Sequence, residues 1–150
     1  MEKIKVLFVC VRNSARSQMA EAFLKVFGSE KFHVESAGLE AGQINQLTMD
    51  AMREMGIDIS NNTTKSVFSL YQQGRLFNYI ISLCDEGSLQ GCPLYPHHIV
   101  KHIVWPFEDP ECFTGTYEER LEKTKVVGDQ IRKEVEKFIH EISDNAAQNK

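Results

Sequence analysis

Long apolar runs are absent from this 150-residue sequence: none reaches the roughly 18 residues that a membrane-spanning helix needs. The apolar stretch near the amino terminus, residues 6–9, is too short for a signal peptide, and polar residues soon follow it. Internal repeats and low-complexity tracts are also absent. These absences predict a cytoplasmic protein that does not bind membranes.

Positive charge is scarce as well. Lysine and arginine total 17 against 21 aspartate and glutamate residues, which gives a formal net charge of −4. Such a mildly acidic surface disfavours nucleic acid and anionic lipid as partners. With 42% hydrophobic and 25% charged residues, the composition is that of an ordinary globular protein. We expect one monomeric domain over residues 1–142 and a flexible tail over residues 143–150.

Cysteine is infrequent, with four residues: Cys10, Cys84, Cys92 and Cys112. A domain of this length buries roughly 70% of the surface of its unfolded chain, so it needs neither disulfides nor a structural metal for stability. Free thiols are expected in a reducing compartment. A cysteine that serves function in this protein is therefore expected to act through its thiolate.

The apolar patterning alternates between the periods of strands and helices. Residues 6–9 form a near-continuous apolar run, typical of a strand buried on both faces, that ends at Cys10. Apolar residues recur every three or four positions over 14–28, which predicts an amphipathic helix closed by Gly28. Similar patterns predict strands at 32–37, 77–83 and 102–105, and helices at 47–55, 67–73 and 116–142.

This alternation is typical of an α/β domain, and we expect a four-stranded parallel sheet of order 2-1-3-4 with helices on both faces. In such sheets the ligand binds beyond the carboxyl ends of the strands. The sequence places Cys10, Cys84 and the segment after Trp105 at those ends. These three places are the first candidates for a functional site.

The loop of residues 10–17 joins the first expected strand to the first expected helix. Main-chain N–H groups of such a turn point inward at a helix N-terminus, where they bind anions. The helix end and the Arg16 guanidinium favour Cys10 as a thiolate, and a hydroxyl of Ser14 or Ser17 can donate to its sulfur. Arg16 can also hold a tetrahedral oxyanion through two parallel hydrogen bonds. A buried, inert cysteine beside a solvated arginine is the alternative, which the flanking strand and helix disfavour.

The pattern C-x5-R-S near the amino terminus resembles the loop of the low-molecular-weight protein tyrosine phosphatase superfamily. Further segments resemble its thioredoxin-coupled arsenate reductase branch, at residues 13–22, 35–38, 56–60 and 105–110. Together they extend from the amino terminus to the last helix. The resemblance implies a low-molecular-weight tyrosine phosphatase-like fold and an enzyme that reduces arsenate to arsenite. It further implies that no cofactor or metal is tightly bound and that thioredoxin supplies the electrons.

The resemblance also implies a role for individual residues. Cys10 is matched to the nucleophile, Arg16 to the clamp on the oxyanion and Asp109 to the general acid. The expected oxyanion-binding residues follow the nucleophile along the loop: Val11, Arg12, Asn13, Ser14, Ala15, Arg16 and Ser17. Among these, Ser17 is matched to a donor to the thiolate and Asn13 to a residue that shapes the loop. The proline after the acid supports its assignment, because proline favours an extended approach of the preceding residue over the loop.

Reduction of arsenate needs two electrons, which this architecture can draw only from thiols. The third strand lies beside the first in the expected order, and adjacent strands are about 4.8 Å apart, within reach of disulfide geometry. Cys84 is therefore expected to attack a Cys10–arsenic adduct, release arsenite and leave a Cys10–Cys84 disulfide. The resemblance implies that Cys92 then attacks Cys84 and carries the disulfide outward to thioredoxin. Cys112 has no role in this scheme.

A phosphatase that forms a Cys10 phosphocysteine is the main alternative, since it needs only one cysteine. Residues 39–42 lack the aromatic side chain that would stack on a phosphotyrosine ring, which favours a bare oxyanion, although Phe107 and Phe113 can partly substitute. A thiol-based sensor that signals through a Cys10–Cys84 disulfide is a second alternative. The sequence shows no long apolar surface for the partner that a sensor requires.

Two positions depart from the family pattern. Arg12 stands where many relatives have glycine, so the loop has no glycine and must reach any positive φ through Asn13. Lys65 stands where some relatives have an acidic residue near a bound monovalent cation, and its ammonium group predicts no dependence on potassium. A zinc site on the histidines of residues 97–102 is not expected, because no C-x2-C pair accompanies them.

Overall fold

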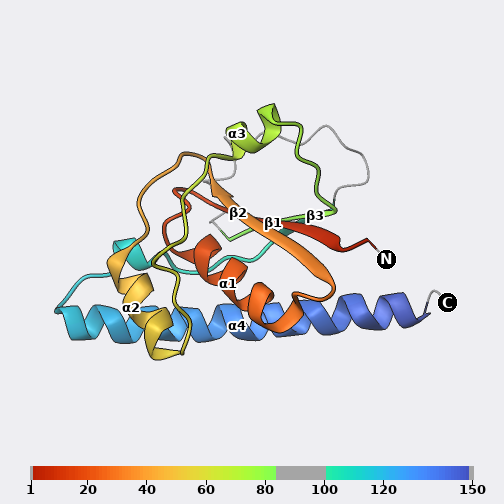
Figure 1. The fold of residues 1–150 in the computed structure, drawn as a ribbon. Coiled ribbons are helices and arrows are strands. Elements are labelled where there is room, and N and C mark those ends of the chain that lie inside the picture. Colours follow the sequence, from red (N-terminus) through yellow and green to blue (C-terminus); the bar gives the residue numbers. More distant parts are fainter. Residues whose placement is uncertain (1, 84–100, 149–150) are drawn as a thin grey trace.

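The computed structural model describes residues 2–83 and 101–148 and shows a sheet covered by helices (Figure 1). Its strands are β1 (Ile4–Cys10), β2 (Phe32–Gly38), β3 (Tyr79–Ser82) and β4 (Lys101–Val104). Neighbouring strands run parallel, in the order β2-β1-β3-β4. Both the order and the direction expected from the sequence are confirmed.

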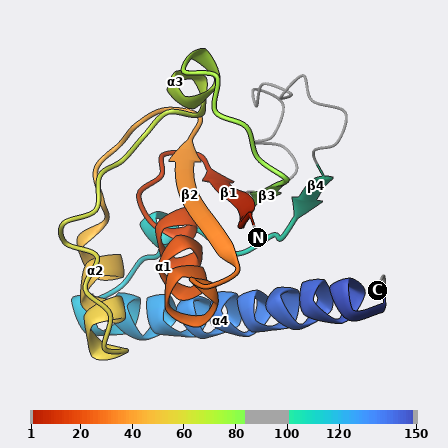
Figure 2. The same cartoon turned by 45° about the vertical axis from the view of Figure 1, so that its right-hand side comes forward.

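The helices of the described residues are α1 (Arg16–Gly28), α2 (Gln46–Glu54), α3 (Val67–Gln72), the short 3-10 helix η2 (Pro110–Cys112) and α4 (Tyr117–Gln148). α1, α2 and α4 lie on one side of the sheet, and α3 lies on the other (Figures 1 and 2). This arrangement confirms helices on both faces. None of the described helices combines the length and the apolar character needed to cross a membrane.

β1 is buried on both faces, which explains its near-continuous apolar sequence. One set of its side chains packs with α1 and α4 in the larger core, which includes Val6, Phe8, Met19, Phe23, Ile131, Val135 and Phe138. The alternate set packs toward α3 in a smaller core, which includes Leu7, Val9, Val67, Leu70 and Ile80. Packing on both faces thereby fixes the position of β1, and its carboxyl end positions the loop that follows.

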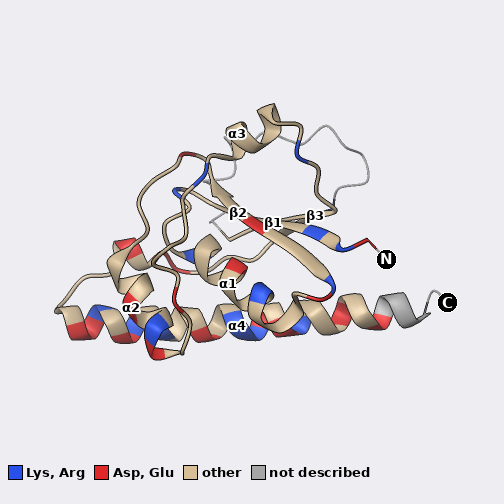
Figure 3. Ribbon diagram, viewed as in Figure 1, with Lys and Arg blue, Asp and Glu red and all other residues tan. Residues whose placement is uncertain are grey.

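α4 buries the apolar stripe expected from its sequence and turns its charged residues to water. The buried positions repeat at three- and four-residue steps: Thr124, Val127, Ile131, Val135 and Phe138. Basic and acidic residues alternate along the outer surface of the helix (Figure 3), where they form i,i+3 and i,i+4 ion pairs such as Arg132–Asp129 and Lys137–Glu141.

The end of α4 differs from the prediction. A helix ending near residue 142 was expected, followed by a tail, but α4 continues to Gln148. Residues 143–148 contain neither glycine nor proline, so nothing in the local sequence forces the helix to stop. The expected end of the helix is therefore wrong, whereas the boundary between domain and tail stays a prediction.

A hydrogen bond ties the first turn of α4 to α2. The Tyr117 hydroxyl donates to the carboxylate of Asp50, which Gln46 and Arg53 also contact. The Tyr117 hydrogen bond is the main cause that lowers the pKa of Asp50, and the same bond raises the pKa of Tyr117. Both shifts indicate that the contact stabilises the fold when Asp50 is ionised and Tyr117 is neutral.

Candidate active site

The candidate nucleophile lies at the carboxyl end of β1. Cys10 is buried, and its Sγ is 2.8 Å from Ser17 Oγ. Asn13 Nδ2 donates to the same Ser17 oxygen at 2.8 Å, which leaves the Ser17 hydroxyl hydrogen available for the sulfur. In this arrangement the Ser17 hydroxyl can donate a hydrogen bond to the Cys10 sulfur. Of the two serines considered as donors, Ser17 is therefore the one in contact with the sulfur.

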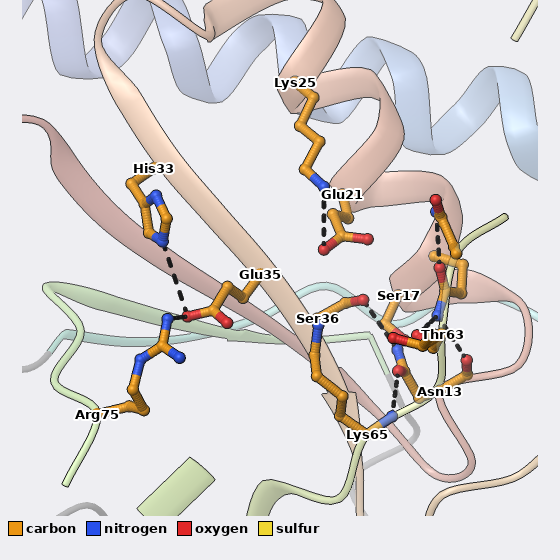
Figure 4. A network of polar contacts seen from close by, with 12 residues as sticks. Asn13, Ser17, Glu21, Lys25, His33, Glu35, Ser36, Thr63, Lys65 and Arg75 are labelled. Atoms are coloured by element: carbon orange, nitrogen blue, oxygen red, sulfur yellow. Dashed lines mark hydrogen bonds and ion pairs between the residues drawn. The ribbon is translucent and has the colours of Figure 1, made fainter. Parts of the chain in front are cut away.

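Asn13 holds the shape of the loop. Its φ of 55° confirms that the chain reaches the left-handed region here without a glycine. The side chain donates to Ser17 Oγ and to Ser36 Oγ (3.0 Å) and accepts the main-chain N–H of Lys65 at 2.9 Å (Figure 4). Because Asn13 is fully buried and bonds to β2 and to the segment before α3, it fixes the loop from two sides.

Gly38 provides the space for this loop. It ends β2 opposite Cys10, and its N–H donates to the Lys65 carbonyl at 2.8 Å. A β-carbon at this position would lie 2.6 Å from Asn13 N and 2.6 Å from Glu40 O. Both are main-chain atoms that cannot turn aside, so the loop passes over β2 only because residue 38 has no side chain.

A further tether was not anticipated from the sequence. Gln18 is buried in α1, and its Nε2 donates to the carbonyls of Asn13 (3.0 Å) and Thr63 (3.2 Å). Asn62 Nδ2 in turn donates to Gln18 Oε1 at 3.1 Å. Gln18 thus links the loop to residues far along the chain. The signal that the sequence offers for this role is that Gln18 is a polar residue in the buried part of an amphipathic helix.

α1 begins at Arg16 with its N-terminus open toward the loop. No side chain caps this end, and the first turn has no acidic residue. The first N–H groups of a helix have no partner within the helix, and they carry partial positive charge. An anion above Cys10 would therefore meet main-chain donors as well as the Arg16 side chain.

Arg16 connects the loop to the segment after β4. Its Nη1 donates to the carbonyls of Leu83 (3.2 Å) and Phe107 (3.1 Å), and its Nη2 lies 3.4 Å from Asp109 Oδ2. The side chain is only 5% exposed. Arg16 Nε is buried and has no hydrogen-bond partner among the described residues. An unsatisfied buried donor is costly, and a bound oxyanion would satisfy it.

Asp109 faces Arg16 across the site. It begins η2, and its Oδ1 accepts the N–H of Glu111 at 3.0 Å. The Oδ2 atom points to the arginine and remains partly accessible, with 27% of the side chain exposed. The hydrogen bond to Oδ1 thus orients the carboxyl group, while Oδ2 faces the site. A general acid at this position needs such an accessible oxygen. Glu108, its neighbour, does not line the same cavity.

These groups enclose a small cavity of about 70 Å³. Sites that enclose drug-sized ligands usually measure roughly 300–1,000 Å³, so this one suits a small ion. Both arginines of the loop and two acidic residues are part of its lining. The complete lining is Cys10, Val11, Arg12, Ser14, Ala15, Arg16, Asp109 and Glu111. Asn13 and Ser17, which were also expected to bind the oxyanion, are not part of this lining; they bond to each other, and Ser17 contacts Cys10. Buried donors and a cysteine sulfur at one small site are suited to nucleophilic attack on an oxyanion.

Of the remaining cysteines, the structure describes only Cys112. Cys84 and Cys92, expected as the electron relay, lie outside the described residues, as do His97 and His98. Leu83 is described: its N–H donates to the Val9 carbonyl at 2.9 Å, and its own carbonyl accepts Arg16. Cys112 is exposed on η2. Within residues 2–83 and 101–148, no group of three or more potential metal ligands occurs.

The chain is similar to known proteins along most of its length. Residues 5–148 match the protein family described as "Low molecular weight phosphotyrosine protein phosphatase". The chain is 40% identical over 139 residues to a protein named arsenate reductase from Shouchella clausii, covering 92% of this chain and 96% of that protein. It is 37% identical over 141 residues to a protein named glutaredoxin arsenate reductase from Synechocystis, covering 93% and 98% of the two chains.

A solved structure is similar as well. It is described as an arsenate reductase in the phosphate binding state and is 36% identical to this chain. The two superimpose with a TM-score of 0.73, over 93% of this chain and 98% of the other.

Proposed function

Because the chain belongs to the low molecular weight phosphotyrosine protein phosphatase family, we propose that it is a cytoplasmic arsenate reductase. One observation carries the proposal: a single small cavity is lined by Cys10, whose sulfur contacts the Ser17 hydroxyl, and by Arg16, whose buried Nε has no hydrogen-bond partner among the described residues. The arsenate reductase names of relatives covering more than nine-tenths of this chain support the choice of oxyanion.

The first step joins the sulfur to arsenic. The Cys10 thiolate attacks arsenate, forms the sulfur–arsenic bond and displaces one oxygen, which leaves as water. Asp109 supplies a proton to this oxygen, and its orientation by the Glu111 N–H supports that role. Arg16 Nε and the open N-terminus of α1 stabilise the negative charge of the remaining oxygens.

The second step supplies the two electrons. The Cys84 thiolate attacks Cys10 Sγ, the sulfur–arsenic electron pair passes to arsenic, and arsenite leaves. Two thiols thereby become the Cys10–Cys84 disulfide while As(V) becomes As(III). The position of Leu83, the residue before Cys84, supports this step, since it bonds to Val9 beside the nucleophile and to Arg16.

Regeneration requires a third thiol. Cys92 attacks Cys84, frees Cys10 and leaves a Cys84–Cys92 disulfide for thioredoxin to reduce. The enzyme then acts as a monomer with no tightly bound cofactor. Because one relative is named a glutaredoxin arsenate reductase, the experiment compares thioredoxin with glutaredoxin as the electron donor.

Hydrolysis of a phosphate monoester is the second candidate function. One observation favours it: Phe107 and Phe113 line a groove that also contains Asp109, next to the oxyanion cavity. An aromatic substrate has a surface to contact there. Hydrolysis requires Cys10, Arg16 and Asp109 but none of the other thiols.

The test is arsenate-dependent oxidation of NADPH, coupled in parallel to thioredoxin with its reductase and to glutaredoxin with glutathione and its reductase. Wild type is compared with Cys84→Ser, Cys92→Ser and Cys112→Ser. Cys112→Ser is the matched control, since it removes an exposed thiol that the relay does not use. Hydrolysis of p-nitrophenyl phosphate is measured on the same four proteins.

We expect turnover with thioredoxin in the wild type and in Cys112→Ser, and none in the two relay variants. After one turnover, Cys92→Ser should accumulate a Cys10–Cys84 disulfide, detectable by mass spectrometry of tryptic peptides. Turnover with glutaredoxin but not with thioredoxin would contradict the proposed electron donor and still support arsenate reduction. Arsenate turnover that survives Cys84→Ser would contradict the relay. No arsenate turnover, with phosphate hydrolysis retained in all four proteins, would establish the phosphatase instead.

A further inference from the structure

The two arginines of the cavity differ in their surroundings. Arg16 is 5% exposed and is held by two carbonyls. Arg12 lines the same cavity, but its side chain is 55% exposed and none of its described contacts is a side-chain hydrogen bond. A guanidinium that lines an anion cavity and keeps its N–H groups free is available to a ligand.

The starting direction of Arg12 is set by a glycine. Gly42 N donates to the Arg12 carbonyl at 2.9 Å. A β-carbon at residue 42 would lie 3.1 Å from Arg12 Cβ and 3.4 Å from Arg12 Nε. The aliphatic part of the Arg12 side chain therefore lies close to the backbone of Gly42. A side chain at residue 42 would push the Arg12 side chain away.

The charged end of Arg12 lies between two carboxylates. Its Nε is 3.9 Å from Glu40 Oε1, and its Nη1 is 4.0 Å from Glu111 Oε2. Both distances exceed the 2.7–3.2 Å range of a hydrogen bond. Exposed ion pairs of this kind contribute little. The two contacts keep Arg12 near the cavity without consuming its donors.

The carboxylates around the cavity explain why a second arginine is useful at residue 12. Glu111 and Asp109 belong to the lining of the cavity, and Glu40 stands close to it through Arg12. Three carboxylates near one opening would repel an oxyanion, and Arg16 alone does not neutralise them. Arg12 reduces the negative potential on the path that the ligand takes.

We infer that Arg12 is an exchangeable second cation of the oxyanion site. It lies beside Glu40 and Glu111 and turns from them to the oxyanion when one binds. The inference rests on the proposed function only in taking the ligand to be a tetrahedral oxyanion. Arg12 then sets affinity for the oxyanion, whereas Arg16 and Asp109 serve the chemical step.

The test measures binding of inorganic phosphate to the reduced protein by titration calorimetry, which needs no turnover. The variants are Arg12→Gln, Arg12→Lys and Glu111→Gln. Arg53→Gln is the matched control, since Arg53 is also an exposed arginine beside a carboxylate, at 3.6 Å, and does not line the cavity.

Arg12→Gln should weaken phosphate binding about ten-fold, and Arg12→Lys, which keeps the charge, should restore part of the loss. Glu111→Gln should tighten binding by roughly two- to three-fold, because it removes a competitor for Arg12. The difference between wild type and Arg12→Gln should shrink in 1 M salt. Arg53→Gln should bind phosphate as the wild type does.

Unchanged affinity in Arg12→Gln would overturn the inference, and so would weaker binding in Glu111→Gln. With arsenate turnover, Arg12→Gln should raise KM and leave kcat within about two-fold. The outcomes separate the two proposals. If arsenate is not reduced but phosphate binding follows the expected pattern, the reductase proposal fails and the role of Arg12 stands.

Discussion

The two walls of the cavity are built differently. The loop of residues 10–17, the inner wall, is buried except at Val11 and Arg12, and Asn13 and Ser17 hold it by hydrogen bonds at 2.8–3.0 Å. The segment of residues 106–113, the outer wall, is mostly exposed or half-buried. It contacts the inner wall through Arg16 and through the loose Arg12–Glu111 pair.

The difference separates two tasks. A site for an oxyanion must present its donors in fixed positions, because donors that rearrange during the reaction lose most of their benefit. A proton donor only has to reach one leaving oxygen. In the proposed mechanism the more buried wall accordingly contains the nucleophile and the anion donors, and the less buried wall contains the acid.

The largest expected effect comes from the outer wall. Asp109→Asn keeps the acceptor for the Glu111 N–H but removes the proton donor. The kcat for arsenate should fall by about 10²–10⁴-fold, while phosphate binding stays within a few-fold of wild type. Glu108→Gln, a change at the exposed neighbour, is the control and should retain activity. Loss of phosphate binding in Asp109→Asn would show that the two walls do not divide these tasks.

The next effect tests the residue that joins the walls. Arg16→Lys keeps the positive charge but cannot bond to Leu83 and Phe107 while presenting a donor to the oxyanion. We expect kcat/KM to fall by about 10²–10³-fold and phosphate binding to weaken as well. If lysine supports near-normal turnover, Arg16 acts only as a charge.

A smaller effect is expected within the inner wall. Ser17→Ala removes the hydroxyl that contacts Cys10, and alkylation of Cys10 by iodoacetamide at pH 7 should slow by about ten-fold. Mass spectrometry of the Cys10 peptide distinguishes it from the exposed Cys112. Ser14→Ala is the matched control, since it removes the other hydroxyl of the loop. Equal slowing in both variants would point to loop disruption instead.

Both walls should be unaffected by a change at the contact between α2 and α4. Tyr117→Phe removes the hydrogen bond that lowers the pKa of Asp50 and raises that of Tyr117. The lowered carboxyl pKa gives stability that is lost as the pH falls through it, and the raised phenol pKa gives stability that is lost as the pH rises through it. Urea unfolding should therefore show a small loss of stability between about pH 4 and pH 10 that diminishes outside this range. Any loss of kcat at pH 7 would contradict a purely structural contact.

No effect at all is expected from potassium. Lys65 donates its main-chain N–H to Asn13 within the network that supports the inner wall (Figure 4), and it brings an ammonium group to that region. Turnover in potassium chloride should equal turnover in choline chloride at the same ionic strength. Stimulation by potassium would show that this region accepts a cation in spite of Lys65.

Much of this arrangement follows from local sequence signals. The period of the apolar residues indicates the strands and helices, and parallel topology then determines the edge at which Cys10 lies. The positive φ of Asn13 follows from a loop that turns sharply without glycine. The strands, the helices and the turn at Asn13 depend on neighbouring residues only, whereas the sheet topology follows from the alternation of these elements along the chain.

The parts that could not be predicted depend on contacts between distant residues. Arg16 bonds to carbonyls 67 and 91 positions away, and Gln18 bonds to Thr63, 45 positions away. Main-chain carbonyls leave no signature in a sequence, because every residue has one. The continuation of α4 to Gln148 was missed because a polar composition does not by itself distinguish a helix from a tail.

Gly38 has a genetic consequence. The loop crosses β2 where a methyl group would lie 2.6 Å from the nitrogen of Asn13, so the smallest substitution, alanine, already collides with backbone. In a saturation library selected for arsenate resistance, codon 38 should tolerate glycine alone. Codon 56 provides the contrast, since a β-carbon there meets nothing within 4 Å and only the φ of 85° disfavours a side chain. An asparagine at position 56 should survive such a selection.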